Sequence, residues 1–529
     1  MSDLDTSLIA PENYNIVMEF EKYAKESNRK ALIFEDDQGN KQEMTYEDLI
    51  NNANKIGNIF LAYGLKKGDK LLVMMPRMIE TYEVYIAALK IGVVIIPCSE
   101  MLRTKDLEYR ISHGEVKGLV SFSSSISQFN DIAKYDQLIK FSIGEKVADW
   151  YDLIHLKNTA SKELNMISTT KNDLAFLPYT SGTTGNPKAV MHTHAWGYAH
   201  MRTAPKNWLA IREHDIVWAT AAPGWQKWVW SPFLSVLGTG ATGFIYSGKF
   251  DPEKYLNLID KYKVNVFCCT PTEYRLMAKL NHLEDFNLYS VHSAVSAGEP
   301  LNREVIDQFK KYFGITVRDG YGQTENSLLL GFLKGMKVKP GSMGMPTPGN
   351  NVQLIDDNCQ PVEVGEVGDI AVPRDTPALF KGYFKDEERT KQTYRGNFYV
   401  TGDQAKMDEE GYFWFEGRND DIIVSSGYTI GPFEVEDALT KHQAVKECAV
   451  IASPDEVRGN VVKAYIVLKN ENDRSNPNLV KELQAHTKQL TAPYKYPRKI
   501  EFTDALPKTS SGKIKRVDLR KLESESIKM

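Results

Sequence analysis

The sequence predicts an α/β fold in which layered, mixed sheets with helices are followed by a β subdomain and a smaller C-terminal unit. Two rounds of apolar strands and helical periodicity indicate the layered sheets. Glycine-punctuated short strands from residue 341 to 417 indicate the β subdomain. With 529 residues and 42% hydrophobic content, the chain is long enough to form several folding units.

Each element of this prediction rests on a short segment. The β subdomain contains NVQLID, GDIAV and GYFWFEG. After Asp420 the pattern restarts as an α/β unit, so this junction is a candidate domain boundary. Each of the two rounds consists of a strand, a helix and a second strand. The first is KLLVMM (70–75), Tyr82–Leu89 and VVIIP (93–97), and the second is VNVFCCTP (264–271), Tyr274–Leu280 and SAVSAG (293–298).

Composition and charge limit the class of partner. A formal net charge of −4 gives no general attraction to nucleic acid or to anionic lipid. The N-terminus lacks a basic leader, and the apolar run Val93–Pro97 is too short to span a bilayer. The five cysteines are scattered and fit neither a disulfide framework nor a zinc site. We therefore expect a cytoplasmic protein without a membrane span that binds small molecules and not nucleic acid.

The most informative stretch is LPYTSGTTGNPKAVMHTH at residues 177–194. Its hydroxyls and backbone N–H groups can donate to phosphate oxygens, and its lysine adds a full positive charge. It is not a Walker loop, because the lysine follows a proline and the glycine spacing differs. The alternative is an ordinary Ser/Thr/Gly surface loop, which this ordered run disfavours. The candidate phosphate-binding residues are Thr180, Ser181, Gly182, Thr183, Thr184, Gly185 and Lys188.

This loop resembles the phosphate-loop signature of the adenylate-forming superfamily, which includes acyl-CoA synthetases, peptide-synthetase adenylation domains and luciferases. The resemblance covers nearly the whole chain. It implies a large N-terminal domain at residues 1–419 and a small, mobile α+β C-terminal domain at residues 420–529. The other signatures follow in the expected order: TPTEYR (270–275), SAGEPL (296–301), DGYGQTE (319–325), YVTGD (399–403), GRNDDIIVSSGYTIGPFEVE (417–436) and PKTSSGKIKR (507–516).

The resemblance assigns nucleotide contacts, each with a physical reason. Glu325 is a hard oxygen ligand suited to Mg²⁺ on the ATP triphosphate, and Thr324 can bond the α-phosphate. Asp403 can accept hydrogen bonds from both ribose hydroxyls, with Arg418 near the same sugar. Without the family match, a solvated glutamate, a turn aspartate and a surface arginine are the alternatives. The other residues assigned to ATP are Gly298, Glu299 and Pro300 beside the adenine, Tyr321 on its other face, and Asp319, Gly320 and Gly322.

Lys513, in the late S-S-G-K segment, resembles the catalytic lysine of the superfamily. A carboxylate that attacks the α-phosphate of ATP brings two anions together, and a cation held between them lowers the barrier. The resemblance places this lysine on the C-terminal domain, which would close for adenylation and then reorient to admit the thiol. Asp420 resembles the hinge residue, and a helix or turn cap is its alternative.

Two C-terminal segments, SPDEVRGNVVKA (453–464) and TAPYKYPRKIEF (491–502), resemble the medium-chain acyl-CoA synthetase branch. They favour CoA over a carrier protein as the thiol. The cluster of Lys495, Arg498 and Lys499 can meet CoA phosphates, with a solvated charged face as an equal alternative. The residues assigned to CoA are Ser426, Gly427, Tyr428 and Arg458.

The acyl pocket is assigned through Gly322 and Trp225. Acetate-specific members place a tryptophan immediately before Q-T-E, whereas Gly322 has no side chain, so we expect a pocket deeper than two carbons. In GWQKWVWSP, Trp225 is a pocket wall or gate by resemblance, while Trp228 and Trp230 are expected in the core or an interface. No charged side chain is expected deep in this region, which favours an apolar acyl tail. Short branched, medium straight and aromatic acids stay open.

Two further motifs are set aside. GTGATG (238–243) fits a dinucleotide-binding pattern, but it follows an expected helix and precedes an expected strand, which is the reverse of that fold. The H-T-H at His192–His194 lacks a third metal ligand, so structural histidines are expected.

Together the motifs imply an AMP-forming acid:CoA ligase. Such an enzyme converts a carboxylic acid and ATP to acyl-AMP and pyrophosphate and then passes the acyl group to CoA. The co-substrates are ATP and CoA, and the implied metal is Mg²⁺. The alternatives are an enzyme that loads an acyl carrier protein and a non-catalytic nucleotide-binding homologue. The oligomeric state is not readable from the sequence, and a homodimer stays open.

Overall fold

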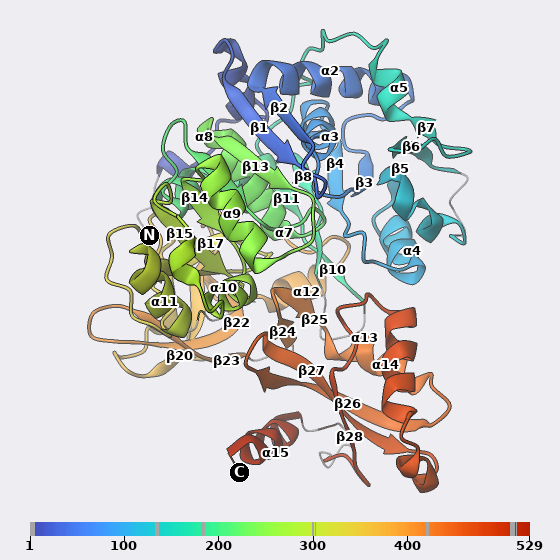
Figure 1. Ribbon diagram of the computed structural model, residues 1–529, viewed down its shortest axis with the longest axis vertical. Coiled ribbons are helices and arrows are strands. Elements are labelled where there is room, and N and C mark those ends of the chain that lie inside the picture. Colours follow the sequence, from blue (N-terminus) through green and yellow to red (C-terminus); the bar gives the residue numbers. More distant parts are fainter. Residues whose placement is uncertain are drawn as a thin grey trace. The chain divides into compact units, whose positions relative to one another are not determined.

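The computed structural model describes residues 6–132, 137–180, 186–298, 301, 303–418, 423–507, 514 and 516–528. The chain divides into two compact units. The larger consists of Met1–Glu100, Leu107–Tyr179 and Ala189–Gly417, and the smaller of Met101–Asp106, Thr180–Lys188 and Arg418–Met529. Figure 1 shows the alternation of helices and strands in both units, which confirms the predicted α/β class.

The first sheet of the larger unit has seven strands in the order β11-β8-β4-β3-β5-β6-β7. All neighbouring pairs are parallel except β11 and β8, so the sheet is mixed, as predicted. The first predicted round corresponds to β3, α3 and β4. The bounds are β3 (Lys70–Met74), β4 (Val94–Pro97), β5 (Val116–Phe122), β6 (Ile139–Ile143), β7 (Tyr151–Asp152), β8 (Leu174–Phe176), β11 (His192–Thr193), α2 (Tyr46–Ala62), α3 (Ile79–Lys90), α4 (Thr104–His113), α5 (Leu153–Lys157) and α6 (His194–Ala204).

The second sheet has nine strands in the order β18-β17-β16-β15-β14-β12-β13-β1-β2. Its six central strands, from β16 to β1, are parallel, and the edge strands β2, β17 and β18 pair antiparallel. The bounds are β1 (Lys30–Glu35), β2 (Lys41–Thr45), β12 (Ile216–Ala219), β13 (Thr242–Tyr246), β14 (Val266–Cys268), β15 (Ser293–Ala297), β16 (Val317–Gly322), β17 (Leu328–Gly331), β18 (Met345–Pro346), α7 (Gln226–Trp228), α8 (Val236–Thr239), α9 (Pro252–Tyr262), α10 (Pro271–Ala278) and α11 (Arg303–Phe313).

Two motifs have simple local explanations in this sheet. Helix α10 starts in TPTEYR with a capping box between Thr270 and Glu273 and with Pro271 in the first turn, so the chain turns into a helix directly after β14. GTGATG lies between α8 and β13, which confirms that its order is the reverse of a dinucleotide-binding unit.

The β subdomain is a sheet of five strands in the order β19-β20-β22-β21, with β23 paired to β22. Its buried residues form a separate apolar cluster that includes Leu354, Ile370 and Phe413. NVQLID, GDIAV and GYFWFEG each contain one of its strands, as predicted. The bounds are β19 (Gln353–Ile355), β20 (Val367–Pro373), β21 (Tyr394–Arg395), β22 (Phe398–Met407), β23 (Phe413–Arg418) and α12 (Glu387–Gln392).

The smaller unit is an α+β unit built on the sheet β26-β27-β28. Strands β26 and β27 are antiparallel, and β28 pairs parallel to β27. The hairpin of β24 and β25 turns through Ser426 and Gly427, both at positive φ, which a tight two-residue hairpin requires. The bounds are β24 (Ile423–Ser425), β25 (Tyr428–Ile430), β26 (Val445–Asp455), β27 (Gly459–Leu468), β28 (Lys499–Phe502), α13 (Pro432–Thr440), α14 (Leu479–Leu490) and α15 (Arg516–Lys528). Among the described residues of both units, we find no helix with the length and apolarity needed to cross a membrane.

Candidate active site

The carboxylate of Asp403 is held by two side chains of the DGYGQTE motif. Tyr321 Oη donates to Asp403 Oδ2 at 2.6 Å, and Gln323 Nε2 donates to the same oxygen at 2.7 Å. Tyr321 lies on β16 of the nine-stranded sheet, whereas Asp403 lies on β22 of the β subdomain. Two donors on one oxygen fix the orientation of a buried carboxylate. The structure therefore joins two predicted nucleotide motifs in one place.

Gln323 links these motifs further and was missed by the sequence reasoning. Its Nε2 also donates to the carbonyl oxygen of Thr401 at 3.0 Å, and its Oε1 accepts from Tyr399 Oη at 3.1 Å. Its position inside DGYGQTE was an available signal. Asp319 and Gly320 lie on the same strand, and the Asp319 carbonyl accepts from Trp208 Nε1 at 3.1 Å.

Glu325 is buried, and its carboxylate is oriented by a tyrosine. Tyr383 Oη donates to Glu325 Oε1 at 2.8 Å. Burial and the charge of Glu325 raise the pKa of Tyr383 far above its usual value, so the phenol stays protonated and keeps donating. A fixed carboxylate oxygen is a ligand type that Mg²⁺ prefers, so Glu325 fits the implied metal. Tyr383 follows Glu325 by 58 residues and lies outside every motif that we identified in the sequence.

The H-T-H histidines are structural supports. His192 donates through Nε2 to the carbonyl oxygen of Thr324 at 2.7 Å, which holds the turn before Glu325. His194 Nδ1 accepts from the backbone N–H of Ile16 at 3.1 Å. Burial lowers the pKa of His192 to about 3, so its ring is neutral near pH 7.

The phosphate loop is described only at its two ends. Thr180 ends β9 (Tyr179–Thr180) and Lys188 begins β10 (Lys188–Ala189), and the two strands pair. Gly298 follows β15 at φ +108°, a conformation that favours glycine. Outside the described residues lie the predicted positions Ser181, Gly182, Thr183, Thr184, Gly185, Glu299, Pro300, Asp420 and Lys513, together with the side chain of Arg418.

The aromatic side chain that borders Gly322 is Trp230, which the sequence reasoning assigned to the core or an interface. A Cβ placed on Gly322 would lie 2.2 Å from the carbonyl oxygen of Ser327 and 3.2 Å from Trp230 Cη2. The backbone therefore excludes a side chain at position 322. Trp225 lies directly before α7, where Gly224, at φ +93°, packs against the backbone of Ser99.

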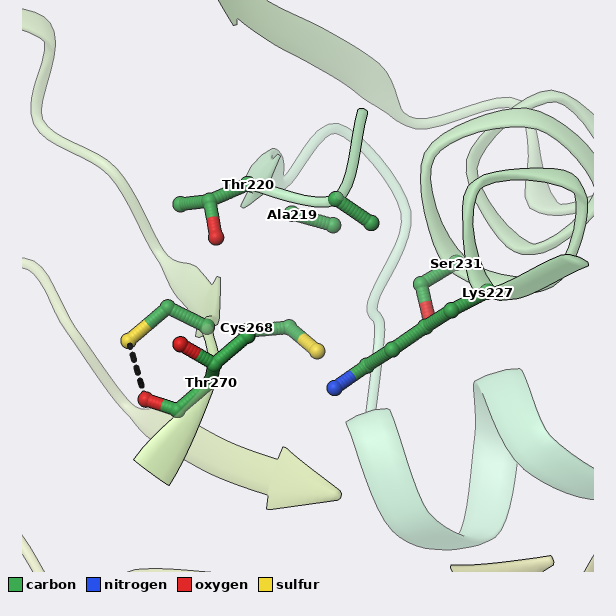
Figure 2. Close-up of a pocket in the computed structure, with 8 residues that line it drawn as sticks. Ala219, Thr220, Lys227, Ser231, Cys268 and Thr270 are labelled. Atoms are coloured by element: carbon green, nitrogen blue, oxygen red, sulfur yellow. Dashed lines mark hydrogen bonds between the residues drawn. The ribbon is translucent and has the colours of Figure 1, made fainter. Parts of the chain in front are cut away.

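A cation lies in this segment, so the expectation of no charged side chain was wrong. Lys227 lines a small cavity, and its Nζ donates to the carbonyl oxygen of Ala297 at 2.6 Å. Figure 2 shows the Lys227 side chain pointing toward Cys268. The cavity lies where the parallel strands β12 and β14 end, an edge where α/β proteins commonly bind ligands. It is lined by Ala219, Thr220, Ala221, Lys227, Ser231, Cys268, Cys269 and Thr270.

In the smaller unit, the predicted CoA residues gather around one turn. Arg458 Nη1 donates to Ser426 Oγ at 3.0 Å, and the Ser426 N–H donates to the Arg458 carbonyl at 3.3 Å. Tyr428 stacks on Tyr494 with ring centroids 4.3 Å apart. Burial and, to a smaller extent, the charge of Arg458 lower the pKa of Arg498, while Tyr496 and Asp455 act in the opposite direction.

The other two cations of the predicted basic cluster are engaged inside the unit. Lys495 is only 4% exposed, and its Nζ donates to Glu434 Oε2 at 2.6 Å. Lys499 donates to Ser453 Oγ at 2.8 Å and to the carbonyl oxygen of Pro454 at 3.1 Å. Arg498 also has a partner, since its Nη1 donates to Tyr496 Oη at 2.6 Å.

Comparisons with known proteins identify the family of the chain. Residues 20–384 match the family model of the AMP-binding enzymes, and residues 434–513 match that of the AMP-binding enzyme C-terminal domain. The chain is 62% identical over 518 residues to the uncharacterized acyl-CoA ligase YtcI of Bacillus subtilis (strain 168), covering 98% of each protein.

Similarity extends to more distant proteins. The chain is 40% identical over 536 residues to the mitochondrial acyl-coenzyme A synthetase ACSM3 of Rattus norvegicus, covering 98% of this chain and 92% of that protein. Its fold matches the crystal structure of the Brucella canis acyl-CoA synthetase with a TM-score of 0.73 and 32% identity, over 98% and 96% of the two chains.

Proposed function

Because the chain belongs to the AMP-binding enzyme family, we propose that it is an acid:CoA ligase that activates a carboxylic acid with ATP and transfers the acyl group to CoA. The observation that carries this proposal is the hydrogen bonding of Asp403 by Tyr321 and Gln323. It brings together two motifs that are far apart in the chain and that we assign to one nucleotide site. The relatives named above are acyl-CoA ligases and synthetases over nearly the same length, which supports the assignment.

In the first half-reaction, an oxygen of the acid carboxylate attacks the α-phosphorus of ATP, and the bond to the β-phosphate oxygen breaks. Acyl-AMP forms and pyrophosphate leaves. Asp403 and Arg418 would hold the ribose, Gly298 to Pro300 and Tyr321 the adenine, and the loop from Thr180 to Lys188 the phosphates. Thr324 and Lys513 would stabilise the charge that develops at the α-phosphate. Mg²⁺, held by Glu325, would neutralise phosphate charge.

In the second half-reaction, the CoA sulfur attacks the acyl carbonyl carbon, AMP leaves, and the thiol proton is released. Arg458, which contacts Ser426, and Arg498 would offer cations to CoA phosphates. Gly427, beside Ser426 and Tyr428, would let the pantetheine arm pass close to the backbone. We assign residues 1–419 and 420–529 to the two domains, with Asp420 as the hinge between the two half-reactions.

For the acid, we propose a short branched or medium-chain carboxylic acid. Position 322 lacks the tryptophan side chain that closes the pocket of acetate-specific members, and Trp230 is the aromatic side chain nearest to it. Lys227 is the one observation that favours a polar group on the acyl tail, since an ammonium group in a small cavity prefers an oxygen acceptor. Hydroxy, oxo and dicarboxylic acids are therefore a second candidate class.

The test is pyrophosphate release across a panel of straight, branched, aromatic, hydroxy and dicarboxylic acids, with and without CoA. Thioester formation is measured in parallel with CoA and with a phosphopantetheine carrier protein. We expect pyrophosphate release that depends on the acid and thioester formation with CoA. Thioester formation on the carrier alone would favour the carrier-loading alternative, and no release with any acid would favour the non-catalytic one.

A further inference from the structure

Within the smaller unit, described residues on either side of Lys513 in the sequence pack into the core. Leu506 precedes Lys513 and Ile514 follows it, and both pack in one apolar cluster with Ile451, Tyr465 and Leu519. Lys513 itself is outside the described residues. Lys513 is joined to Ile514 by a peptide bond, so the position of Ile514 limits where the Lys513 backbone can lie.

After Ile514, helix α15 is fixed by an ion pair. Arg516 Nη2 contacts Glu436 Oε1 at 2.7 Å and Glu436 Oε2 at 2.8 Å. The two side chains are only 9% and 11% exposed. Glu436 lies on α13, and its Oε1 also accepts from the backbone N–H of Val450 on β26 at 2.7 Å. The glutamate is thereby fixed to the sheet and cannot follow α15 if that helix shifts.

These contacts hold Arg516 in a fixed position, three residues after Lys513 in the chain. Arg516 Nη2 donates to both oxygens of a buried carboxylate, and that carboxylate is held in turn by the Val450 N–H. The proposed reaction needs the Lys513 charge at the α-phosphate in the first half-reaction only. A displacement of about 1 Å in a group that stabilises a transition state costs up to roughly a hundredfold in rate.

We propose that Glu436 is a positioning residue for adenylation: through Arg516 it holds the Lys513 segment in register, and it has no part in thioester formation. This inference rests on the proposed function. It assigns a role to a buried ion pair that touches neither ATP nor CoA. It predicts that loss of the Glu436 charge slows acyl-AMP formation and leaves thioester formation from acyl-AMP nearly unchanged.

The test compares Glu436→Gln with the wild-type protein in both half-reactions. Glutamine keeps an acceptor for the Val450 N–H but loses the charge that holds Arg516. We expect pyrophosphate release to fall by about ten- to a hundredfold. Thioester formation from supplied acyl-AMP should stay within about twofold, because Lys513 is not needed there. Hydrogen exchange of residues 507–516 should accelerate in the variant, which reports on the segment without any activity.

Glu523→Gln is the matched control, because Glu523 is another buried glutamate that ties α15 to the sheet. It accepts from Ser453 Oγ at 2.6 Å, from Tyr465 Oη at 3.1 Å and from Lys463. It lies seven residues beyond Arg516, so we expect its loss to change both half-reactions by the same factor. If Glu436→Gln does not fold, Arg516→Lys carries the same comparison, because it keeps the charge on a shorter side chain that cannot reach the Glu436 carboxylate in the same way.

The outcomes separate this inference from the proposed function. Equal slowing of both half-reactions by Glu436→Gln, slowing of acyl-AMP formation alone by Glu523→Gln, or unchanged exchange of residues 507–516 would each overturn the positioning role. A wild-type protein that releases no pyrophosphate with any acid would instead overturn the proposed function, and the exchange measurement would still decide whether Glu436 holds the segment.

Discussion

Tyr383 donates a hydrogen bond to Glu325 Oε1 at 2.8 Å, and both side chains are buried. The bond runs between the segment that leads into α12 and the turn that follows β16. It fixes the carboxylate expected to hold Mg²⁺, in the way that hydrogen bonds from neighbouring residues commonly orient metal ligands.

Tyr383→Phe is therefore expected to weaken the response to Mg²⁺. Loss of such a supporting bond typically costs about ten- to a hundredfold in metal affinity. The Mg²⁺ concentration for half-maximal pyrophosphate release should rise by that factor, with the maximal rate largely retained. Tyr394→Phe, a half-buried tyrosine of the same subdomain, is the control and should leave the titration unchanged. An unshifted Mg²⁺ midpoint in Tyr383→Phe would contradict the role.

Three buried histidines predict how stability depends on pH. Burial lowers the pKa of His192 to about 3 and those of His194 and His200 to about 4, from an ordinary value of 6.5. Below pH 6.5 these histidines are protonated in the unfolded chain but stay neutral in the folded chain. The free energy of unfolding therefore falls as the pH falls toward 4. Each histidine contributes a slope of about 1.4 kcal/mol per pH unit in that window.

His200→Gln isolates this effect from the carboxylates. His200 hydrogen bonds to Ser327 Oγ at 2.7 Å and to the Trp230 carbonyl at 3.0 Å, and glutamine can serve both positions. Denaturant midpoints measured between pH 7.5 and 4.5 should decline less steeply in the variant than in the wild type, by about one histidine's slope. Identical slopes would show that His200 is protonated in the folded state.

The sequence predicted those parts of the protein that depend on local pattern. KLLVMM and VVIIP became β3 and β4, and DGYGQTE placed Tyr321 and Gly322 at the end of β16. Apolar alternation and glycine punctuation specify such strands directly, because side-chain period and turn geometry are local properties. The order of the family motifs then indicated which strand ends meet the nucleotide.

Contacts between distant segments could not be predicted in this way. Tyr383 and Gln323 support Glu325 and Asp403 through side-chain hydrogen bonds that cross between the sheet and the β subdomain. Lys227 lines the cavity, and Trp230 lies beside Gly322, only because α7 and the residues after it pack against distant strands. A helical period cannot tell such a lysine from one on a solvated face, since the difference lies in tertiary packing.

Asp403→Asn is expected to weaken ATP binding rather than the later step. The Oδ2 atom accepts from both Tyr321 and Gln323. In the asparagine variant, an amide nitrogen at the Oδ2 position would face these two donors, and one at the Oδ1 position would remove an acceptor for the ribose. A buried unsatisfied polar group costs about 1–3 kcal/mol, so the KM for ATP should rise roughly five- to a hundredfold. The KM for CoA with supplied acyl-AMP should not change. A larger effect on CoA than on ATP would argue against the ribose assignment.

Lys513→Ala should nearly abolish acyl-AMP formation. Removing one group that stabilises developing charge typically costs about a hundred- to a thousandfold in rate. Thioester formation from supplied acyl-AMP should remain, and the two half-reactions are measured by pyrophosphate release and by CoA thioester yield. Equal loss of both would remove the support for a C-terminal domain that alternates between two half-reactions.

Arg458→Ala should act on the CoA step alone. Arg458 Nη1 donates to Ser426 Oγ at 3.0 Å, so its guanidinium lies at the turn that we assign to CoA. A hydrogen bond to a charged group contributes about 1.5–3 kcal/mol, so the KM for CoA should rise roughly ten- to a hundredfold, with pyrophosphate release unchanged. The effect should shrink at high salt, because phosphate contacts are screened.

Lys499→Ala is the matched control. The Lys499 ammonium already donates to Ser453 and Pro454, so the KM of this variant for CoA should stay near the wild-type value. If Lys499→Ala raised that KM as much as Arg458→Ala, the CoA phosphates would have to lie along β28 and not at the Ser426–Arg458 turn.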